Sequence, residues 1–568
     1  MSDNVRMRIA LLSHQWPGAR MGGIGSCVRQ TAIALARAGH DVHVFTLTLP
    51  ADVRAALPPD VCIHETPDIA ESVATNVIPA PLAAAIGAGG EGIYRLAIGW
   101  RLAGALLEVH SQRPFDVVEA PEVEALGLPL LLQPEFDVPV VTHLHCCTAI
   151  AREANGGPLD EEGRLTAALE FAAIHLADAV CAPTEAVAVL TRELVPTMPS
   201  PRIIPHPFAG ASSSFNAPPP TGPVLFVGRL ERLKGVESLI EALNQFLPPR
   251  PEAMFRFIGP DTNTAGGRSM RQFLQSRLDP SIRNRVEFCG ELSPAEISAS
   301  WARASFGVMP SLRDNFSMAC CEAMAAGRTI VVALGTGSVE LIGDAGIVAD
   351  RGSVASLSRA MADLWDDRDR LLRLSQAAFE RIRTFCSPDR VAAQRISFYE
   401  DCLRPSAHER RAARSQQLAA LPPACSSAIL PALSRITGIL AGVRQPLVHT
   451  PGTRLLHIMN GLERRHRQPA KVLLYGAGKH TARLLSERQV WESRGHRIVG
   501  IIDDHPRFQQ SPVYLDLPVQ SVGAAKARVL DGHDLPPVVL STDTYEDQFW
   551  DQSAPLREAG VPVFRLYT

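Results

Sequence analysis

The sequence lacks both a strong charge excess and a long apolar run. Its 56 Lys and Arg residues stand against 59 Asp and Glu residues, which gives a formal charge of −3. Nucleic-acid-binding proteins usually carry a clear basic excess, so we expect no nucleic-acid partner. No uncharged stretch is long enough to span a bilayer. Residues 82–109 come closest, but four charged side chains interrupt them, which leaves room for a peripheral membrane contact only.

The cysteines also lack the spacing of a metal or disulfide framework. The eleven cysteines contain no CxxC pair, and the adjacent pairs Cys146-Cys147 and Cys320-Cys321 suit neither disulfide nor zinc geometry. We interpret them as small buried residues in a reducing compartment. The apolar run after Met7 is short and leads into a polar loop, which does not fit a secretory signal peptide. The sequence therefore predicts a cytoplasmic protein, with the inner face of the membrane left open.

What the sequence does contain is an alternation of short apolar runs with helical patterns, over a length that suggests roughly three or four domains. This alternation is typical of parallel α/β sheets. We expect strands at 9–12, 42–45, 117–118, 138–142 and 179–182, and then at 224–227, 255–258, 286–288, 306–309 and 329–332. The fold class is thus α/β, with two facing Rossmann-like domains at 1–205 and 206–390, a closing helix at 391–404, a linker with helical pieces at 405–465, and a third Rossmann-like domain at 466–568.

A glycine-rich loop follows the first expected strand. It reads Gly22-Gly23-Ile24-Gly25 and is followed by a helical pattern. Glycine lets backbone amides approach an anion, and a helix N-terminus adds positive potential. The loop therefore predicts contact with a phosphate or another polar ligand. The alternative is a tight strand-to-helix turn without a ligand.

A second motif follows the strand expected at 224–227. The segment 228–235 reads GRLERLKG and places Arg229 and Lys234 at the carboxyl end of a parallel strand. Open α/β sheets bind ligands at that edge, and a departing diphosphate requires positive charge there. The alternative is an ordinary solvated loop.

The third motif spans 310–327 and follows the strand expected at 306–309. We expect a helix from about Ser317 to Gly327, in which Glu322 is the single charge among small and apolar residues. A carboxylate in such a helix must find hydrogen-bond donors. Sugar or ribose hydroxyls are suitable donors, and Asp314 lies one loop away on the same edge. The alternative is a structural glutamate bound to backbone amides or an arginine.

A histidine pair closes the strand expected at 138–142. His143 and His145 flank Leu144, so in an extended segment their side chains share one side. A histidine at the carboxyl end of a strand can face a cleft. A single histidine, however, is more often a structural residue.

As a set, these motifs resemble the family-4 glycosyltransferases, which are retaining enzymes of the GT-B fold. The resemblance covers about residues 7–404 and rests on the glycine loop, on the GRLxxxKG pattern, and on an acidic residue eight positions before Glu322. Segment 335–342 is loosely similar to a later GGxxE segment of the family. Three departures concern the donor sugar: Asp314 replaces the usual Glu, Ser317 replaces a Gly, and Cys146 stands where a small residue is frequent.

The resemblance implies a role for each matching residue. Arg229 and Lys234 would hold the donor diphosphate, Glu322 would bind the donor ribose, and Asp314 would contact the donor sugar. His145 would lie beside the reacting centre. The remaining donor-site residues are Gly22, Gly23, Phe316, Ser317 and Met318.

The function implied by the resemblance is retaining transfer of a sugar from a nucleoside-diphosphate sugar to a hydroxyl of a sugar or glycolipid acceptor, in glycan or polysaccharide biosynthesis. No cofactor and no metal would be required, because the two cations take the place of the metal ion that other transferases use. The alternatives are a GT-B-fold sugar-nucleotide epimerase, a phosphorylase, and a non-catalytic sugar-nucleotide-binding protein.

The C-terminal segment opens with a further strand–loop–helix pattern. Gly476, Gly478 and Lys479 follow an expected strand at 472–475, and Asp503 follows a second one at 498–502. The segment resembles the nucleotide-sugar-binding module of bacterial sugar acyltransferases. It would bind a nucleotide or nucleotide sugar through the loop amides and Asp503. The alternative is a structural domain without a ligand.

Overall fold

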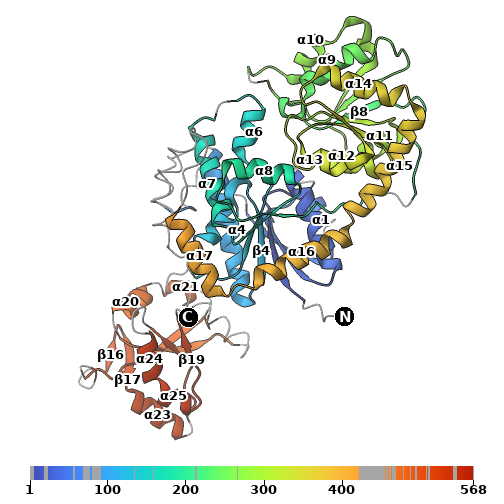
Figure 1. Ribbon diagram of the computed structural model, residues 1–568. Coiled ribbons are helices and arrows are strands. Elements are labelled where there is room, and N and C mark those ends of the chain that lie inside the picture. The colour runs from blue at the N-terminus through green and yellow to red at the C-terminus, as the bar shows by residue number, and fades with distance from the viewer. Residues whose placement is uncertain are drawn as a thin grey trace. The chain divides into compact units, whose positions relative to one another are not determined.

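The computed structural model divides into two compact units, Met1–His110 with Pro114–Gln445, and Ser111–Arg113 with Pro446–Thr568 (Figure 1). Its described residues are 6–17, 23–55, 58–67, 77–79, 91–133, 135–157, 159–210, 214–264, 266–420, 455, 458–459, 462, 468–477, 479–486, 488–492, 495–506, 508, 512–531, 533–541 and 546–566. The expected α/β class with three Rossmann-like domains is confirmed.

The first domain is built on a sheet of seven parallel strands in the order β3-β2-β1-β4-β5-β6-β7. The strands are β1 (Arg8–Leu12), β2 (Asp41–Leu47), β3 (Val61–Thr66), β4 (Val117–Pro121), β5 (Val140–His143), β6 (Ala179–Ala182) and β7 (Arg202–Ile203). The helices are α1 (Gly23–Arg37), α2 (Ala51–Ala55), α4 (Glu91–Gln112), α5 (Leu128–Leu131), α6 (Thr148–Ala154), α7 (Glu161–Leu176) and α8 (Glu185–Leu194).

The edge strands β3 and β7 are absent from the sequence-based expectation. In β3, the side chains of Cys62, Ile63, His64 and Glu65 are exposed or half-buried. An edge strand has a neighbour on one side only, and its sequence does not need the continuous apolar run that marks a central parallel strand. Such a strand is therefore harder to predict from apolar runs.

The second domain is a parallel sheet of six strands in the order β10-β9-β8-β11-β12-β13. The strands are β8 (Val224–Val227), β9 (Phe255–Ile258), β10 (Val286–Gly290), β11 (Gly307–Met309), β12 (Ile330–Ala333) and β13 (Ile347–Ala349). Its helices are α9 (Val236–Phe246), α10 (Met270–Arg277), α11 (Pro294–Arg303), α12 (Met318–Ala325), α13 (Gly337–Ile342), α14 (Val354–Trp365) and α15 (Arg368–Phe385). Most strand residues are buried, as expected where helices cover both faces of a parallel sheet.

The chain then returns to the first domain. Helix α16 (Pro388–Leu403) lies along α1, and its apolar face enters the core of the first domain (Figure 1). Helix α17 (Ala407–Ala419) falls in the stretch predicted as a linker, yet it is docked on the same domain. Arg414 donates to the carbonyls of Phe136 and Val138 and pairs with Asp178. A buried arginine that satisfies several carbonyls fixes the helix in place.

The third sheet has the order β16-β17-β15-β14-β18-β19, with one antiparallel pair, β16 and β17. Its strands are β14 (Lys471–Tyr475), β15 (Arg497–Ile502), β16 (Val513–Tyr514), β17 (Leu517–Gln520), β18 (Val538–Leu540) and β19 (Val563–Arg565). Among the described residues, the sheet is accompanied by helices α20 (Lys479–Ser486), α21 (Gln489–Glu492), α23 (Val522–Leu530), α24 (Glu546–Gln552) and α25 (Ala554–Glu558).

Within the described residues, no helix has the length and apolarity to cross a membrane. Helix α4 overlaps the stretch that we left open for a peripheral membrane contact. Many of its apolar side chains are buried in the protein, among them Leu96, Ile98, Trp100, Leu102 and Leu106. Residues 82–90 of that stretch lie outside the described residues.

Candidate active site

Both sheets of the first unit have a point where the strand order reverses, and open α/β sheets bind ligands at such points. In the second sheet the reversal lies between β8 and β11, so the loops after Val227 and Met309 meet there. These two loops carry the second and third sequence motifs. In the first sheet the reversal lies between β1 and β4, where the glycine loop and the segment 122–125 emerge.

The structure brings Lys234 and Asp314 together at the reversal in the second sheet. Lys234 Nζ donates to Asp314 Oδ2 at 3.1 Å, and Ser311 Oγ donates to the same oxygen at 3.0 Å. Burial alone would lower the pKa of Lys234, but Asp314 and Glu231 outweigh it and raise that pKa. The lysine is therefore a fixed positive charge, with a quarter of its side chain still exposed.

The close approach of the two loops depends on Gly235. Its φ is +72°, and a Cβ there would lie 2.0 Å from the carbonyl oxygen of Pro310. Any other residue would force apart the loops that carry Lys234 and Asp314. The glycine that ends the GRLERLKG segment therefore maintains the ion pair.

Arg229 lies on the open side of the same loop. Its guanidinium contacts Glu231 Oε1 at 2.9 Å, and 61% of its side chain is exposed. The backbone N–H of Leu233 donates to Asn155 Oδ1 at 2.8 Å, so the cationic loop also contacts the end of α6 in the first domain. Arg229 is thus held beside an interdomain contact with its charge accessible.

Helix α12 places Glu322 on the same edge. The helix begins at Met318, with the Ser317 hydroxyl accepting from the N–H of Cys320, and the chain leaves it through Gly327 at φ +73°. Glu322 is half-buried, and burial raises the pKa of its carboxyl, with a smaller opposing influence from the nearby Trp301. The predicted helix start and end are confirmed, and the ribose role of Glu322 stays a prediction.

The glycine loop is only partly described. Gly22 lies outside the described residues, and Gly23 is the first residue of α1. A Cβ at Gly23 would meet no atom within 4 Å, whereas one at Gly25 would lie 2.9 Å from the backbone of Gln15. Gly25 is therefore required for packing of the loop against α1. Gly23 faces open space and leaves its backbone accessible.

His145 belongs to a buried group of rings. The ring centroids of His143 and His145 are 4.4 Å apart, as expected for two side chains on one side of an extended segment. His206 lies 5.4 Å from His145 and 4.7 Å from Phe316. The Nε2 atoms of His143 and His145 are buried and have no hydrogen-bond partner among the described residues. His206 therefore links the two strand-end histidines to Phe316 in the loop after β11.

A buried charge network contacts this group of rings through His143. Arg395 of α16 pairs with Glu119 of β4, and Tyr399 Oη donates to Glu119 Oε2 at 2.6 Å. Glu119 Oε1 lies 3.1 Å from His143 Nδ1. Burial alone would raise the pKa of Glu119, but Arg395, His143 and Tyr399 hold it well below its usual range. The returning helix therefore fixes the orientation of His143.

Three further acids surround the segment after β4. Glu124 and Ala125 have φ values of 62° and 53°, a conformation that costs about 1–3 kcal/mol for residues other than glycine. Glu170 accepts from the N–H of Glu124 at 3.0 Å and from Thr148, and thereby holds the strained turn. Glu122 accepts from the N–H of His145 at 2.6 Å. Burial raises the pKa of Glu122 to about 8 and that of Glu170 to about 7.

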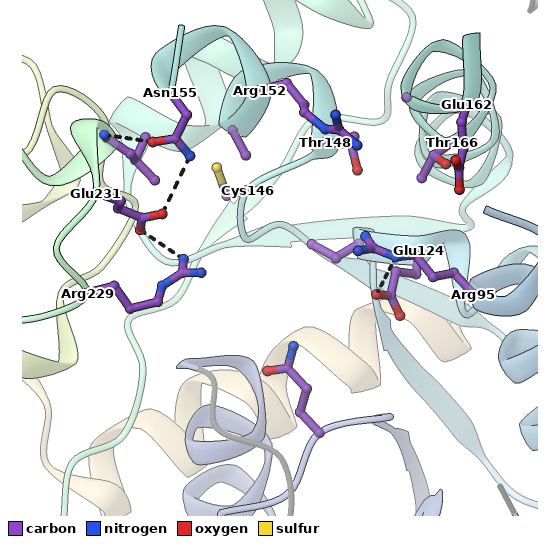
Figure 2. A pocket seen from close by; sticks show the side chains of 15 residues that line it. Arg95, Glu124, Cys146, Thr148, Arg152, Asn155, Glu162, Thr166, Arg229 and Glu231 are labelled. Carbon is purple, nitrogen blue, oxygen red and sulfur yellow. Dashed lines mark hydrogen bonds and ion pairs between the residues drawn. The ribbon is translucent and has the colours of Figure 1, made fainter. Parts of the chain in front are cut away.

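An open cavity of about 370 Å³ lies between the two domains (Figure 2). Figure 2 shows Arg229 and Glu231 on one side and the paired Arg95 and Glu124 on the other. The charged side chains that line it are Arg95, Glu124, Arg152, Glu162, Arg229 and Glu231. Only Arg229 among these was predicted from the sequence. Glu231 lies in the same second-domain loop as Arg229. The other four come from separate loops and helices of the first domain, and no contiguous motif joins them.

The third domain has the predicted glycine turn, with Gly476 at φ +100°. Asp503 Oδ2 accepts from the N–H of Ala477 at 2.7 Å, and its other carboxylate oxygen accepts from the N–H of His505 at 2.8 Å. Asp503 therefore holds the turn itself. Gly478 and the side chain of Lys479 lie outside the described residues.

Comparison with known proteins assigns the first unit. A model described as a glycosyl transferase 4-like domain matches residues 22–208, and one described as glycosyl transferases group 1 matches residues 222–367. The first unit is a glycosyltransferase of the GT-B type. Neither match reaches the third domain.

Several relatives share most of this glycosyltransferase. The glycogen synthase of Mycobacterium tuberculosis is 28% identical over 410 residues, which cover 69% of this chain and 94% of that protein. The D-inositol 3-phosphate glycosyltransferase of Corynebacterium aurimucosum is 26% identical over 444 residues, covering 72% of this chain and 99% of that protein.

Solved structures agree with the fold of the glycosyltransferase. Sucrose-phosphate synthase from Thermosynechococcus elongatus matches with a TM-score of 0.54 and 20% identity, over 70% of this chain and 99% of that chain. HepE from Anabaena, in complex with UDP and glucose, matches with a TM-score of 0.52 and 16% identity, over 70% and 100% of the two chains.

Sequence reasoning missed several residues of this candidate site. His206 follows the last strand of the first sheet as a single residue between two prolines. Glu122 and Glu124 follow β4, and their position at a strand end was the one available signal. Arg395 lies in α16, more than 270 residues from Glu119 in the chain, so no local pattern joins them.

Proposed function

We propose that the protein transfers a sugar from a nucleoside-diphosphate sugar to a hydroxyl group, with retention of the anomeric configuration. The observation that carries the proposal is the cationic loop at the reversal of the second sheet. There, Lys234 is fixed by Asp314, and Arg229 faces the interdomain cavity. Two such cations suit a leaving diphosphate, whose negative charge grows as the glycosidic bond breaks.

In this proposal, separate residues bind the diphosphate, the ribose and the sugar of the donor. Arg229 and Lys234 bind the diphosphate, Glu322 accepts from ribose hydroxyls, and Asp314 contacts the sugar. A glutamate with few protein donors gains most from ligand hydroxyls, because its burial is otherwise uncompensated. The Anabaena structure contains UDP and glucose, so UDP-glucose is the first donor to test.

The acceptor enters from the first domain. The cavity places Arg95, Glu124, Arg152 and Glu162 opposite Arg229. Both donors and acceptors of hydrogen bonds are present there, which suits a ligand rich in hydroxyl groups, such as a sugar or the head of a glycolipid. This lining favours a role in glycan or polysaccharide synthesis, and it offers no basic surface for nucleic acid. The cytoplasmic location stays a proposal from the sequence.

No metal ion takes part in the proposed reaction, because Arg229 and Lys234 supply the charge that a divalent cation would supply elsewhere. His145 lies near the donor-side loop through His206 and Phe316. With its amide fixed by Glu122, the histidine is suited to position the reacting sugar.

The deciding experiment is incubation with UDP-glucose and a panel of sugar acceptors. Release of UDP that depends on the acceptor, with an α-anomeric signal in the product by NMR, is expected. Conversion of the nucleotide sugar without an acceptor would indicate an epimerase. Release of sugar 1-phosphate with inorganic phosphate as co-substrate would indicate a phosphorylase. Turnover that survives treatment with EDTA is expected, and its loss would contradict the metal-free proposal.

For the third domain, we propose that the turn at 476–480 binds a nucleotide or nucleotide sugar. Both carboxylate oxygens of Asp503 hold backbone amides, but each keeps a lone pair for a ribose hydroxyl. Calorimetry of the full chain should then show one more nucleotide-binding site than the Asp503→Ala variant. Equal stoichiometry in the two proteins would leave the domain without this role.

A further inference from the structure

We propose that His43, Cys62 and His64 form a binding site for a zinc-class transition metal at the edge of the first sheet. Strands β2 and β3 are adjacent and parallel, and their register pairs His43 with Cys62. His64 lies two residues after Cys62, so it shares the same face of the sheet. One thiol and two imidazoles therefore meet on one surface, and sulfur and nitrogen are the ligands that zinc prefers.

The ligand atoms are already close to one another. One atom from each of the three side chains lies within 4.8 Å of the other two. His43 Nδ1 and His64 Nε2 are 2.8 Å apart. Ligands of a tetrahedral zinc ion are separated by roughly 3.5 Å, given the bond lengths of zinc to nitrogen and sulfur. A small separation of the two rings and a rotation of the thiol toward them reach that geometry.

An acidic residue supports the site from behind. His43 Nε2 lies 3.2 Å from Asp41 Oδ1. In the metal-free structure, Arg8 Nε donates to the same Nε2 at 3.3 Å. Coordination through Nδ1 moves the ring proton to Nε2, which requires Arg8 to give up this contact and lets Nε2 donate to the Asp41 carboxylate. A carboxylate behind a ligating histidine is the common arrangement in metal sites, because it fixes the tautomer and the ring orientation. Arg8 also contacts Asp41, at 3.3 Å, so its charge is balanced by that carboxylate.

Metal binding at this site balances in protons and charge. Cys62 is exposed, so its thiol proton can pass to water as the sulfur–metal bond forms. The step needs no oxidant or reductant: one S–H bond breaks, one S–metal bond forms, and the ion keeps its charge state.

The position of the site separates it from glycosyl transfer. His43 and Cys62 lie in the N-terminal halves of β2 and β3, whereas the groups proposed for transfer follow the carboxyl ends of strands. The aromatic rings of Phe45 and Phe115 pack against the two histidines and account for their burial. Packing alone does not require an exposed thiol beside them. The metal would stabilise the edge strand rather than take part in the reaction.

The test is titration of the full chain with Co²⁺, followed by competition with Zn²⁺. We expect one equivalent to bind, with the near-ultraviolet band of a thiolate–cobalt bond. Cys62→Ser should abolish the band, and His64→Ala should weaken Co²⁺ binding by more than the roughly 10- to 100-fold that loss of a carboxylate behind a ligand costs. Cys289→Ser is the matched control, because Cys289 is a partly exposed cysteine outside the cluster, and it should leave the band unchanged.

Two outcomes overturn the proposal. A wild-type protein that binds no Co²⁺ or Zn²⁺ would show that the histidine pair is only a packed hydrogen bond. A cobalt band that persists in Cys62→Ser would place the metal on other thiols. Circular dichroism of each variant confirms folding, and turnover in Cys62→Ser should equal that of the wild type.

Discussion

The two domains of the glycosyltransferase differ in how far their charged side chains are exposed to solvent. The second domain presents its charges at the surface: Arg229 and Lys234 are at least partly exposed, and each is paired with an acid nearby in the site. In the first domain, Arg95 and Arg152 line the cavity. Other charged side chains form a buried network, in which Glu119 and Arg395 are almost completely covered. The exposed cations of the second domain fit the proposed diphosphate site, whereas the buried network of the first domain holds its strand ends in place.

Energetics explain why the two sides differ in mutational sensitivity. An exposed pair contributes little to stability, typically about 0.2–1 kcal/mol, because water screens it. A buried pair that loses one partner leaves an uncompensated charge and destabilises by about 3–5 kcal/mol. Substitutions in the buried network of the first domain should therefore affect folding, and substitutions of the exposed cations of the second domain should affect turnover.

Arg395→Met is expected to have the largest effect. It leaves Glu119 buried without its cation, so the free energy of unfolding should fall by about 3–5 kcal/mol in urea titration. The double variant Arg395→Met with Glu119→Gln should recover part of this loss, because the uncompensated charge is then removed. An unchanged urea midpoint in Arg395→Met would contradict the network. Tyr399→Phe should lower the free energy of unfolding by less than Arg395→Met or Glu119→Gln alone.

Lys234→Ala should instead have its large effect on turnover. Removal of one group that stabilises the developing charge costs about 3 kcal/mol, or ~10²-fold in kcat. Arg229→Ala should lower kcat less, because its exposed charge is screened. The matched control is Arg303→Ala, an exposed cation on α11 outside the cavity. Equal kcat in Lys234→Ala and Arg303→Ala would refute the diphosphate role.

Glu122→Gln tests a buried acid of the first domain through the pH dependence of stability. The pKa of Glu122 is raised from 4.5 to about 8, so between these pH values the unfolded state loses a proton that the folded state keeps. Stability is therefore full below pH 4.5 and falls as the pH rises toward 8. The amide lacks this dependence. By calorimetry, we expect the wild type and Glu122→Gln to have equal melting temperatures near pH 4.5. At pH 8 the free energy of unfolding of the variant should exceed that of the wild type by on the order of 2 kcal/mol.

Glu340→Ala should have the smallest effect. Its carboxylate accepts from the N–H groups of Glu185 and Ala186, both at 2.8 Å, and so joins α13 of the second domain to the start of α8 in the first. Loss of such a cap costs about 1 kcal/mol. Denaturant titration should show this cost, and Glu340→Gln should recover part of it. A fully stable Glu340→Ala variant would indicate that water replaces the contact.

Much of the second domain could be predicted from the sequence, because its site is built from contiguous segments. The loop 228–235 and the segment 310–327 each follow a buried strand, and parallel strands bring their carboxyl ends to one edge. The first domain could be predicted in class and in most central strands. Its edge strands β3 and β7 were missed, and so was the docking of α17 through Arg414.

The sequence by itself determined the α/β class, the position of the cationic loop, the start and end of α12, and the shared side of His143 and His145. These depend on local patterns of apolar residues, glycines and caps, which act over a few residues. Tertiary structure alone decided that Lys234 pairs with Asp314, that His206 joins the histidines to Phe316, and that Arg395 lies under Glu119. Partners far apart in the chain meet only after the sheets form and α16 returns, because burial of charge is a property of the whole fold.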